Sequence, residues 1–139
     1  MKFNPATIAL AVTGLWVLPA AAADFNGSKP FTCALMSLNS CSSDGECQSE
    51  TPDSAGIPRF LFVDAKGGQI SGRHADGQLL STKIERQRTL DDMLVMEGAE
   101  GRLSWTVTVN QATGEMSLGA VGADLGFVVF GSCVRAAPN

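Results

Sequence analysis

Leu103–Asn110, with the sequence LSWTVTVN, alternates apolar and polar side chains along its whole length. The odd-numbered residues are Leu, Trp, Val and Val, and the even-numbered residues are Ser, Thr, Thr and Asn. Successive side chains of a β-strand point to opposite faces, so this period of two predicts a strand with one face in the core. The loop that follows, Asn110–Gly114, ends in a glycine placed for the left-handed position of a hairpin turn. We therefore expect the chain to return antiparallel to this strand.

Strand-like segments recur along the rest of the chain. Alternation continues at residues 116–120, the turn Gly122–Asp124 follows, and the apolar run LGFVVFGSC at residues 125–133 is typical of a central or closing strand. Weaker strand signals, separated by Gly67–Gly68, Asp76–Gly77 and other turn residues, occupy residues 31–38, 60–63, 69–73 and 79–87. Seven or eight short strands predict an all-β fold, a small antiparallel up-and-down barrel. A two-sheet β-sandwich is the alternative.

Residues 89–97 allow two interpretations. Thr89 and Asp92 are spaced as in a helix cap, and the apolar residues that follow Thr89 have helical spacing. A single short helix would interrupt a regular series of strands, however, so we favour a strand over Thr89–Glu97.

Residues 1–23 have the features of a secretory signal peptide. Lys2 supplies a positive charge, Ala6–Leu18 an apolar stretch and Pro19–Ala23 a cleavage site of small residues. The apolar stretch is too short to span a bilayer, and no later segment reaches the roughly 18 apolar residues that a transmembrane helix needs. We expect cleavage before Asp24, a single domain over residues 24–139, no membrane insertion after cleavage, and a location in the periplasm or outside the cell.

The charge of this domain is acidic. The chain has 10 Lys and Arg against 14 Asp and Glu, and cleavage removes one cation, Lys2, and no acid, which leaves a net charge of about −5. Binding to nucleic acid requires clustered Lys and Arg. We therefore expect no nucleic-acid partner.

Four cysteines remain after cleavage: Cys33, Cys41, Cys47 and Cys133. Their spacings do not match the C-x₂-C pairs of a zinc site, and export favours disulfides. Three pairings are open to four cysteines. A short polar segment separates Cys41 from Cys47, so we expect these two to pair and Cys33 to join Cys133, tying the first strand to the last. The Ser-, Asp- and Pro-rich stretch from Cys41 to Gly56 predicts a surface loop.

Motifs that carry catalysis or hold a metal are missing from the sequence. His74, the single histidine, sits in a turn-like segment, and there is no G-x-S-x-G nucleophile motif. The acidic residues Asp44, Glu46, Glu50 and Asp53 lack the order of an EF-hand loop. Asp91 and Asp92, placed on a strand, would point to opposite faces and could not flank one bond. We expect a protein that is not an enzyme and has no cofactor or metal site.

Two further features are candidates for binding. Arg86, Arg88 and Arg102 could form a basic patch for an anionic ligand, although isolated surface arginines are more common. Trp105, the one tryptophan left after the leader is removed, is expected either to fill the core or to form a platform for a ligand.

Parts of the sequence resemble proteins that we know. Residues 101–114, 126–133 and 58–64, with the spacing of Cys33, Cys41 and Cys47, resemble a group of small exported proteobacterial proteins of uncharacterised function. In architecture the chain is also similar to periplasmic inhibitors of c-type lysozyme, which combine a small barrel, a signal peptide and a disulfide between near-terminal strands. Those inhibitors share a Ser-Gly-Ala-x-Tyr type segment, and this chain has Ser71-Gly72-Arg73 and no tyrosine. The resemblance therefore implies no inhibitory residue here.

Two functions follow from these observations. The first is a non-catalytic interaction or inhibitor module that binds an unknown protein through its surface or loops. The second is a carrier that holds a small hydrophobic ligand inside the barrel. A barrel of eight strands can be filled by its own side chains or can hold one small ligand, and the residue types leave both open.

Overall fold

A computed structural model describes residues 24–135, and the predicted signal peptide lies outside the described residues. The described part consists of strands, turns and loops and contains no helix, so it has no helix that could cross a membrane. Ten strands are present, with these bounds: β1 Phe31–Ser42, β2 Cys47–Glu50, β3 Phe60–Asp64, β4 Gln69–Arg73, β5 Leu79–Lys83, β6 Arg86–Leu90, β7 Met93–Glu100, β8 Leu103–Asn110, β9 Glu115–Val121 and β10 Leu125–Arg135.

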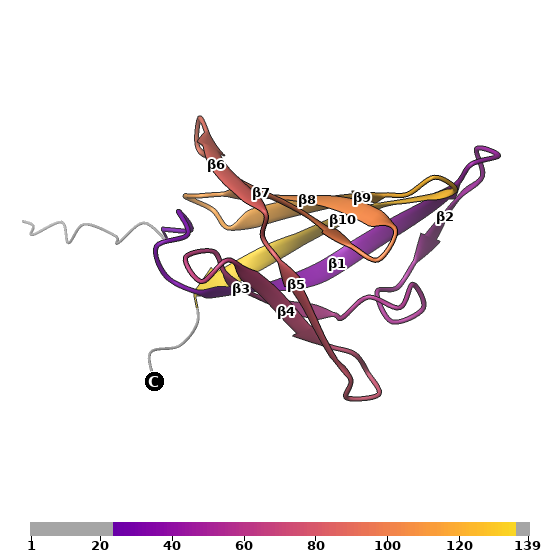
Figure 1. The fold of residues 1–139 in the computed structure, drawn as a ribbon, viewed down its shortest axis with the longest axis horizontal. Coiled ribbons are helices and arrows are strands. Elements are labelled where there is room, and N and C mark those ends of the chain that lie inside the picture. The colour runs from indigo at the N-terminus through magenta and orange to yellow at the C-terminus, as the bar shows by residue number, and fades with distance from the viewer. Residues whose placement is uncertain (1–23, 136–139) are drawn as a thin grey trace, which may run out of the picture.

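All ten strands belong to one antiparallel sheet. Nine of them follow the order β5-β4-β3-β1-β10-β9-β8-β7-β6, and β2 pairs with the second half of β1. Apart from the β3–β1 and β1–β10 pairs, neighbours on this path follow each other in the chain and are joined by short turns. Figure 1 shows β1 and β10 running through the middle of the molecule, with β3 to β5 on one side and β7 to β9 on the other. The prediction of a disulfide-stabilised, barrel-like all-β fold is confirmed.

The sheet curls until its two ends approach each other. β5 and β6 form the two ends of the strand order, yet only Ile84 and Glu85 separate them in sequence. Glu85 N–H donates to the carbonyl of Glu97 in β7 (2.9 Å), and Ile84 N–H donates to the carbonyl of Gly68 before β4 (2.8 Å). The chain therefore crosses from one end of the sheet to the other at this point, and the curled sheet encloses an interior.

The interior is apolar because the strands alternate. Inward residues of β8, namely Trp105, Val107 and Val109, are 7%, 1% and 0% exposed, and the same face carries apolar residues from every long strand. This alternation was the main signal in the sequence, and the structure places it as predicted.

Two disulfides join residues that lie directly opposite each other on neighbouring strands. Cys33 pairs with Cys133 across β1 and β10, and Cys41 pairs with Cys47 across β1 and β2. Both predicted pairings are present. Disulfides of this kind indicate an oxidising, extracytoplasmic environment.

Three local predictions need correction. Residues 89–97 are not one strand: β6 ends at Leu90, Asp91 and Asp92 form a turn, and β7 begins at Met93. Asp91 has φ 51°, a left-handed conformation that Asp tolerates better than most residues. The strand expected at 79–87 is divided at Ile84, where the chain changes its pairing partner. The stretch expected as a loop contains the end of β1 and the whole of β2.

Candidate ligand-binding pocket

An apolar pocket of 310 Å³ opens into the barrel interior. Its wall includes inward residues of β5 and residues from the first part of β8, two strands that are distant in the strand order. This volume is at the lower end of the range of small-molecule sites. The lining residues come from the loop before β3 and from β3, β4, β5, β7, β8, β9 and β10: Ala55, Gly56, Ile57, Pro58, Leu61, Ile70, Leu80, Thr82, Glu100, Leu103, Trp105, Val107, Leu118, Ala120, Leu125 and Phe127.

Trp105 forms part of the pocket wall and is held from two sides. Its cross-strand partner on β7 is Gly98, where an added Cβ would lie 2.4 Å from Cζ2 of the indole. Nε1 donates to Oγ1 of Thr82 on β5 at 3.3 Å, and that hydroxyl donates to the carbonyl of Ala99 at 3.3 Å. The indole thus connects β8 to β5 across the curled sheet. The structure is consistent with both roles expected for Trp105, filling the core and forming a platform for a ligand, because the ring is buried and also borders the pocket.

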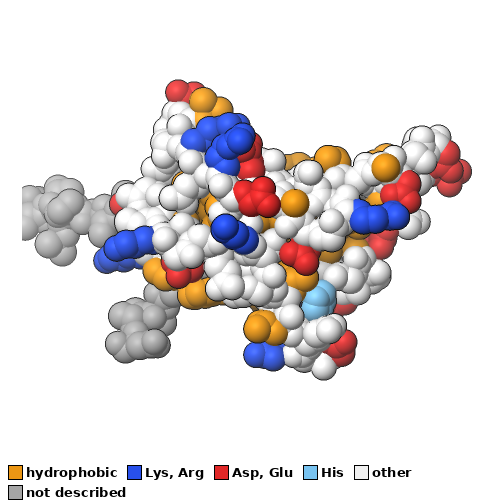
Figure 2. Space-filling view, viewed as in Figure 1, with side chains coloured by type: hydrophobic (Ala, Val, Ile, Leu, Met, Phe, Trp, Pro, Cys, Tyr) orange, Lys and Arg blue, Asp and Glu red, His pale blue; other side chains and the backbone are white. Residues whose placement is uncertain are grey.

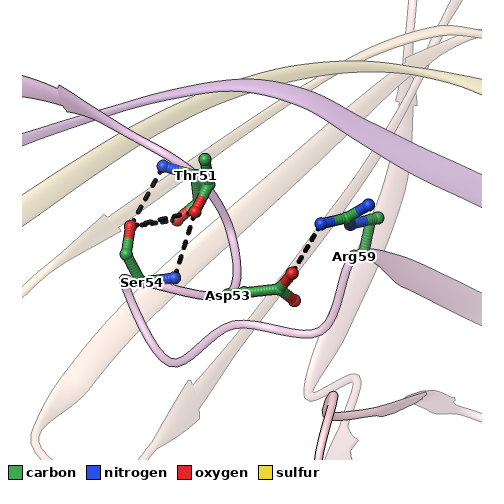
Figure 3. A network of polar contacts seen from close by, with 4 residues as sticks. All are labelled: Thr51, Asp53, Ser54 and Arg59. Carbon is green, nitrogen blue, oxygen red and sulfur yellow. Dashed lines mark hydrogen bonds and ion pairs between the residues drawn. The ribbon is translucent and has the colours of Figure 1, made fainter.

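The loop between β2 and β3 forms one side of the pocket. Hydrogen bonds and an ion pair join residues within this loop (Figure 3). Asp53 makes an ion pair with Arg59 at 2.6 Å, and the hydroxyl of Ser54 donates to the carbonyl of Thr51 at 2.9 Å. Ile57 N–H donates to the carbonyl of Pro52 at 2.8 Å. These bonds fold the loop back on itself, so Ala55–Pro58 presents apolar side chains to the interior.

The pocket has little charge. Among its lining residues, all within the described part of the chain, none is Lys or Arg, and Glu100 is the one carboxylate. Glu100 is exposed to solvent at the edge of the pocket. The remaining polar side chain is Thr82, whose hydroxyl is already engaged with Trp105 and Ala99. A ligand here would meet an almost uniformly apolar surface.

A polar groove adjoins this pocket and shares Ala55, Leu125 and Phe127 with it. Glu50 in the groove accepts a hydrogen bond from the hydroxyl of Ser40, and a second from Nε2 of Gln48 at 3.0 Å. The Ser40 hydroxyl is the main reason why the pKa of Glu50 lies below its usual value, and Gln48 adds to it. The groove therefore carries negative charge at neutral pH.

The other acidic residues of this region do not converge on one point. The pKa of Asp44 is lowered by the Ser42 hydroxyl first and by Glu46 N–H second, and Asp53 pairs with Arg59. Asp44 and Asp53 thus each have a partner of their own. Over residues 24–135, no group of three or more His, Cys, Asp and Glu side chains could hold a metal ion.

The candidate basic patch is divided between two places. Arg86 and Arg88 on β6 both face Glu97, at 3.6 and 3.1 Å, and Figure 2 shows basic side chains gathered over β6 beside acidic ones. Arg102 pairs instead with Asp124 at 3.2 Å, at the turn before β10. The three arginines therefore do not form one anion site. His74 lies in the turn between β4 and β5, where its backbone closes the hairpin with Gln78 (2.9 Å).

No protein-family model matches the sequence, and no curated protein matches it significantly.

Proposed function

We propose that the protein binds a small hydrophobic ligand in the barrel interior and acts as a carrier for it. The observation that carries this proposal is the 310 Å³ apolar pocket beside Trp105. A barrel filled by its own side chains would leave no such space. Ligand sites in proteins are typically concave, mostly apolar, and equipped with a few polar groups that orient the ligand.

The character of the lining restricts the class of ligand. A fatty acid or a phosphate ester would need a cationic partner for its head group, and the lining has none among the described residues. Glu100 at the edge and Glu50 in the adjoining groove add negative charge instead. The ligand that fits this arrangement is an apolar molecule whose polar end is neutral or cationic.

Titration of the exported protein with a neutral hydrophobic probe, N-phenyl-1-naphthylamine, tests the proposal. Trp105 is the single tryptophan of the mature chain, so saturable quenching of its emission would report binding close to it. A matched pair of variants on β5 supplies the control: Leu80 lines the pocket, while its neighbour Leu79 points outward and is 61% exposed.

Leu80→Glu should weaken probe binding about tenfold or more, because it places a carboxylate in an apolar lining. Leu79→Glu should leave the affinity unchanged. Unsaturable quenching in the unsubstituted protein, or equal losses in the two variants, would show that the probe binds elsewhere.

An interaction or inhibitor module, the first function expected from the sequence, is the second proposal for this chain. Its direct assay is inhibition of c-type lysozyme by the purified protein.

A further inference from the structure

Six of the ten exposed large apolar side chains in the described residues lie on three adjacent strands and form what we call the apolar stripe: Met36, Phe60, Phe62, Val128, Phe130 and Val134. Their exposed fractions lie between 42% and 73%. They belong to β3, β1 and β10, which are direct neighbours at the centre of the sheet. Because these residues point away from the pocket and the core, neither the fold nor the proposed ligand site explains them.

The strand register places these residues side by side. Phe62 lies opposite Thr32, which in turn lies opposite Val134. Phe60 lies opposite Ala34 in the next row, and Phe130 lies opposite Ser37 in the row after that. The positions between the large side chains are thus small or uncharged. The stripe is a continuous surface across three strands.

The area of the stripe is that of a protein interface. Its six exposed fractions add up to between three and four fully exposed residues, or on the order of 500–600 Å² of side chain. The largest apolar patch on a typical monomer reaches about 300–600 Å², and a standard interface buries about 800 Å² on each partner. Two copies joined through the stripe would together bury on the order of 1,000–1,200 Å² from these six side chains, which clears the roughly 1,000 Å² that a specific interface needs.

We propose that the apolar stripe is the interface of a homodimer. A two-fold symmetric contact brings the same patch of both copies together, so the patch must be complementary to itself. A face with no charged side chain between its large residues meets this condition. The rest of the surface carries net negative charge, so two copies would repel each other there. The position of β1 near the middle of the sheet lets two copies meet face to face without involving the sheet ends.

This dimer would leave the ligand pocket free. The stripe occupies the outer face of β3, β1 and β10, and the pocket is lined by residues of the inner face, such as Leu61 and Phe127 on two of the same strands. Dimerisation and ligand binding can therefore be tested separately, and the failure of one would not imply the failure of the other.

Sedimentation equilibrium of the exported, oxidised protein between about 1 and 200 µM tests the dimer. Phe60→Thr and Phe130→Thr, alone and together, remove stripe area and introduce β-branched residues, which suit a strand as aromatic residues do. Leu79→Thr is the matched control, because Leu79 is 61% exposed on β5, outside the stripe. We expect a concentration-dependent dimer that the double variant weakens at least tenfold and that the control leaves intact.

Three results would overturn the proposal: a monomer at every concentration, a dimer that persists in the double variant, or an equal loss in the control. A monomer that sediments with neutral phosphatidylcholine vesicles would assign the stripe to a membrane surface instead. Should the double variant fail to fold, as judged by near-ultraviolet circular dichroism, Met36→Gln with Val134→Thr tests the same face.

Discussion

The two disulfides should differ strongly in what they contribute to stability. The Cys33–Cys133 bond closes a loop with a sequence separation of 100 residues, whereas the Cys41–Cys47 bond closes one of 6. In the chain-entropy model, a cross-link restricts the unfolded chain more as its loop grows. This gives about 4.7 kcal/mol for the long loop and about 2.3 kcal/mol for the short one.

The burial of Cys33 and Cys133 also predicts a larger loss of stability when this disulfide is removed. Cys33 and Cys133 are 0% and 4% exposed, so replacing both with alanine also removes packed sulfur atoms from the core. Cys47, in contrast, is exposed in the β1–β2 hairpin. We expect the free energy of unfolding to fall by about 4–5 kcal/mol in Cys33→Ala/Cys133→Ala and by about 2 kcal/mol in Cys41→Ala/Cys47→Ala. Since small domains have a total stability of about 5–15 kcal/mol, the first variant should be close to its unfolding limit at 37 °C.

Urea unfolding under non-reducing conditions, followed by Trp105 fluorescence, measures both losses. Each double variant leaves the other disulfide intact and introduces no free thiol. The hydrogen bonds between β1 and β10 are independent of the sulfur atoms, so the fold should persist in both. Equal losses, or a larger loss on removing Cys41–Cys47, would refute the reasoning that the longer cross-link restricts the unfolded chain more.

Two further changes have definite expected outcomes. Gly98→Ala should destabilise the protein by about 1–3 kcal/mol and shift the emission of Trp105, because the new methyl group would collide with the indole. The control Gly119→Ala should do neither, because no atom lies within 4 Å of the added carbon. Thermal unfolding followed by fluorescence measures both effects, and equal behaviour of the two variants would contradict the prediction. Glu50 has its pKa lowered mainly by the Ser40 hydroxyl, so its contribution to stability is present above its ordinary value of 4.5 and lost as the pH falls through the lower folded value. The drop in melting temperature between pH 5 and pH 3 should therefore be smaller in Glu50→Gln than in the unsubstituted protein, and identical pH profiles would argue against this role.

The sequence predicted the strands best where one face is buried and the other is exposed to solvent. β8 has two such faces, so apolar and polar residues alternate strictly over residues 103–109. The structure places the apolar side chains on the buried face, as predicted. The break at Ile84 had no comparable signal. It arises because β5 pairs with β4 and β6 pairs with β7, a change of partner that depends on how the sheet closes and that no local pattern encodes.

The candidate pocket could be foreseen only in part. Trp105 was identified from its place in an alternating strand, but its hydrogen bond to Thr82 depends on the approach of two strands distant in the sheet. The loop residues Ala55–Pro58 were missed because the segment before them is strongly polar. An available signal was the short run Ala-Gly-Ile-Pro after that polar stretch, in which Pro58 is among the most buried residues.

Native mass spectrometry of the protein purified from a periplasm without reduction is the decisive test of ligand binding by the barrel. We expect a small neutral or cationic hydrophobic molecule bound to the chain, or uptake of N-phenyl-1-naphthylamine when the purified chain is empty. Leu80→Glu should lose this adduct and Leu79→Glu should keep it. A chain that carries no molecule and takes up no probe, in the unsubstituted protein, would contradict a ligand-binding barrel.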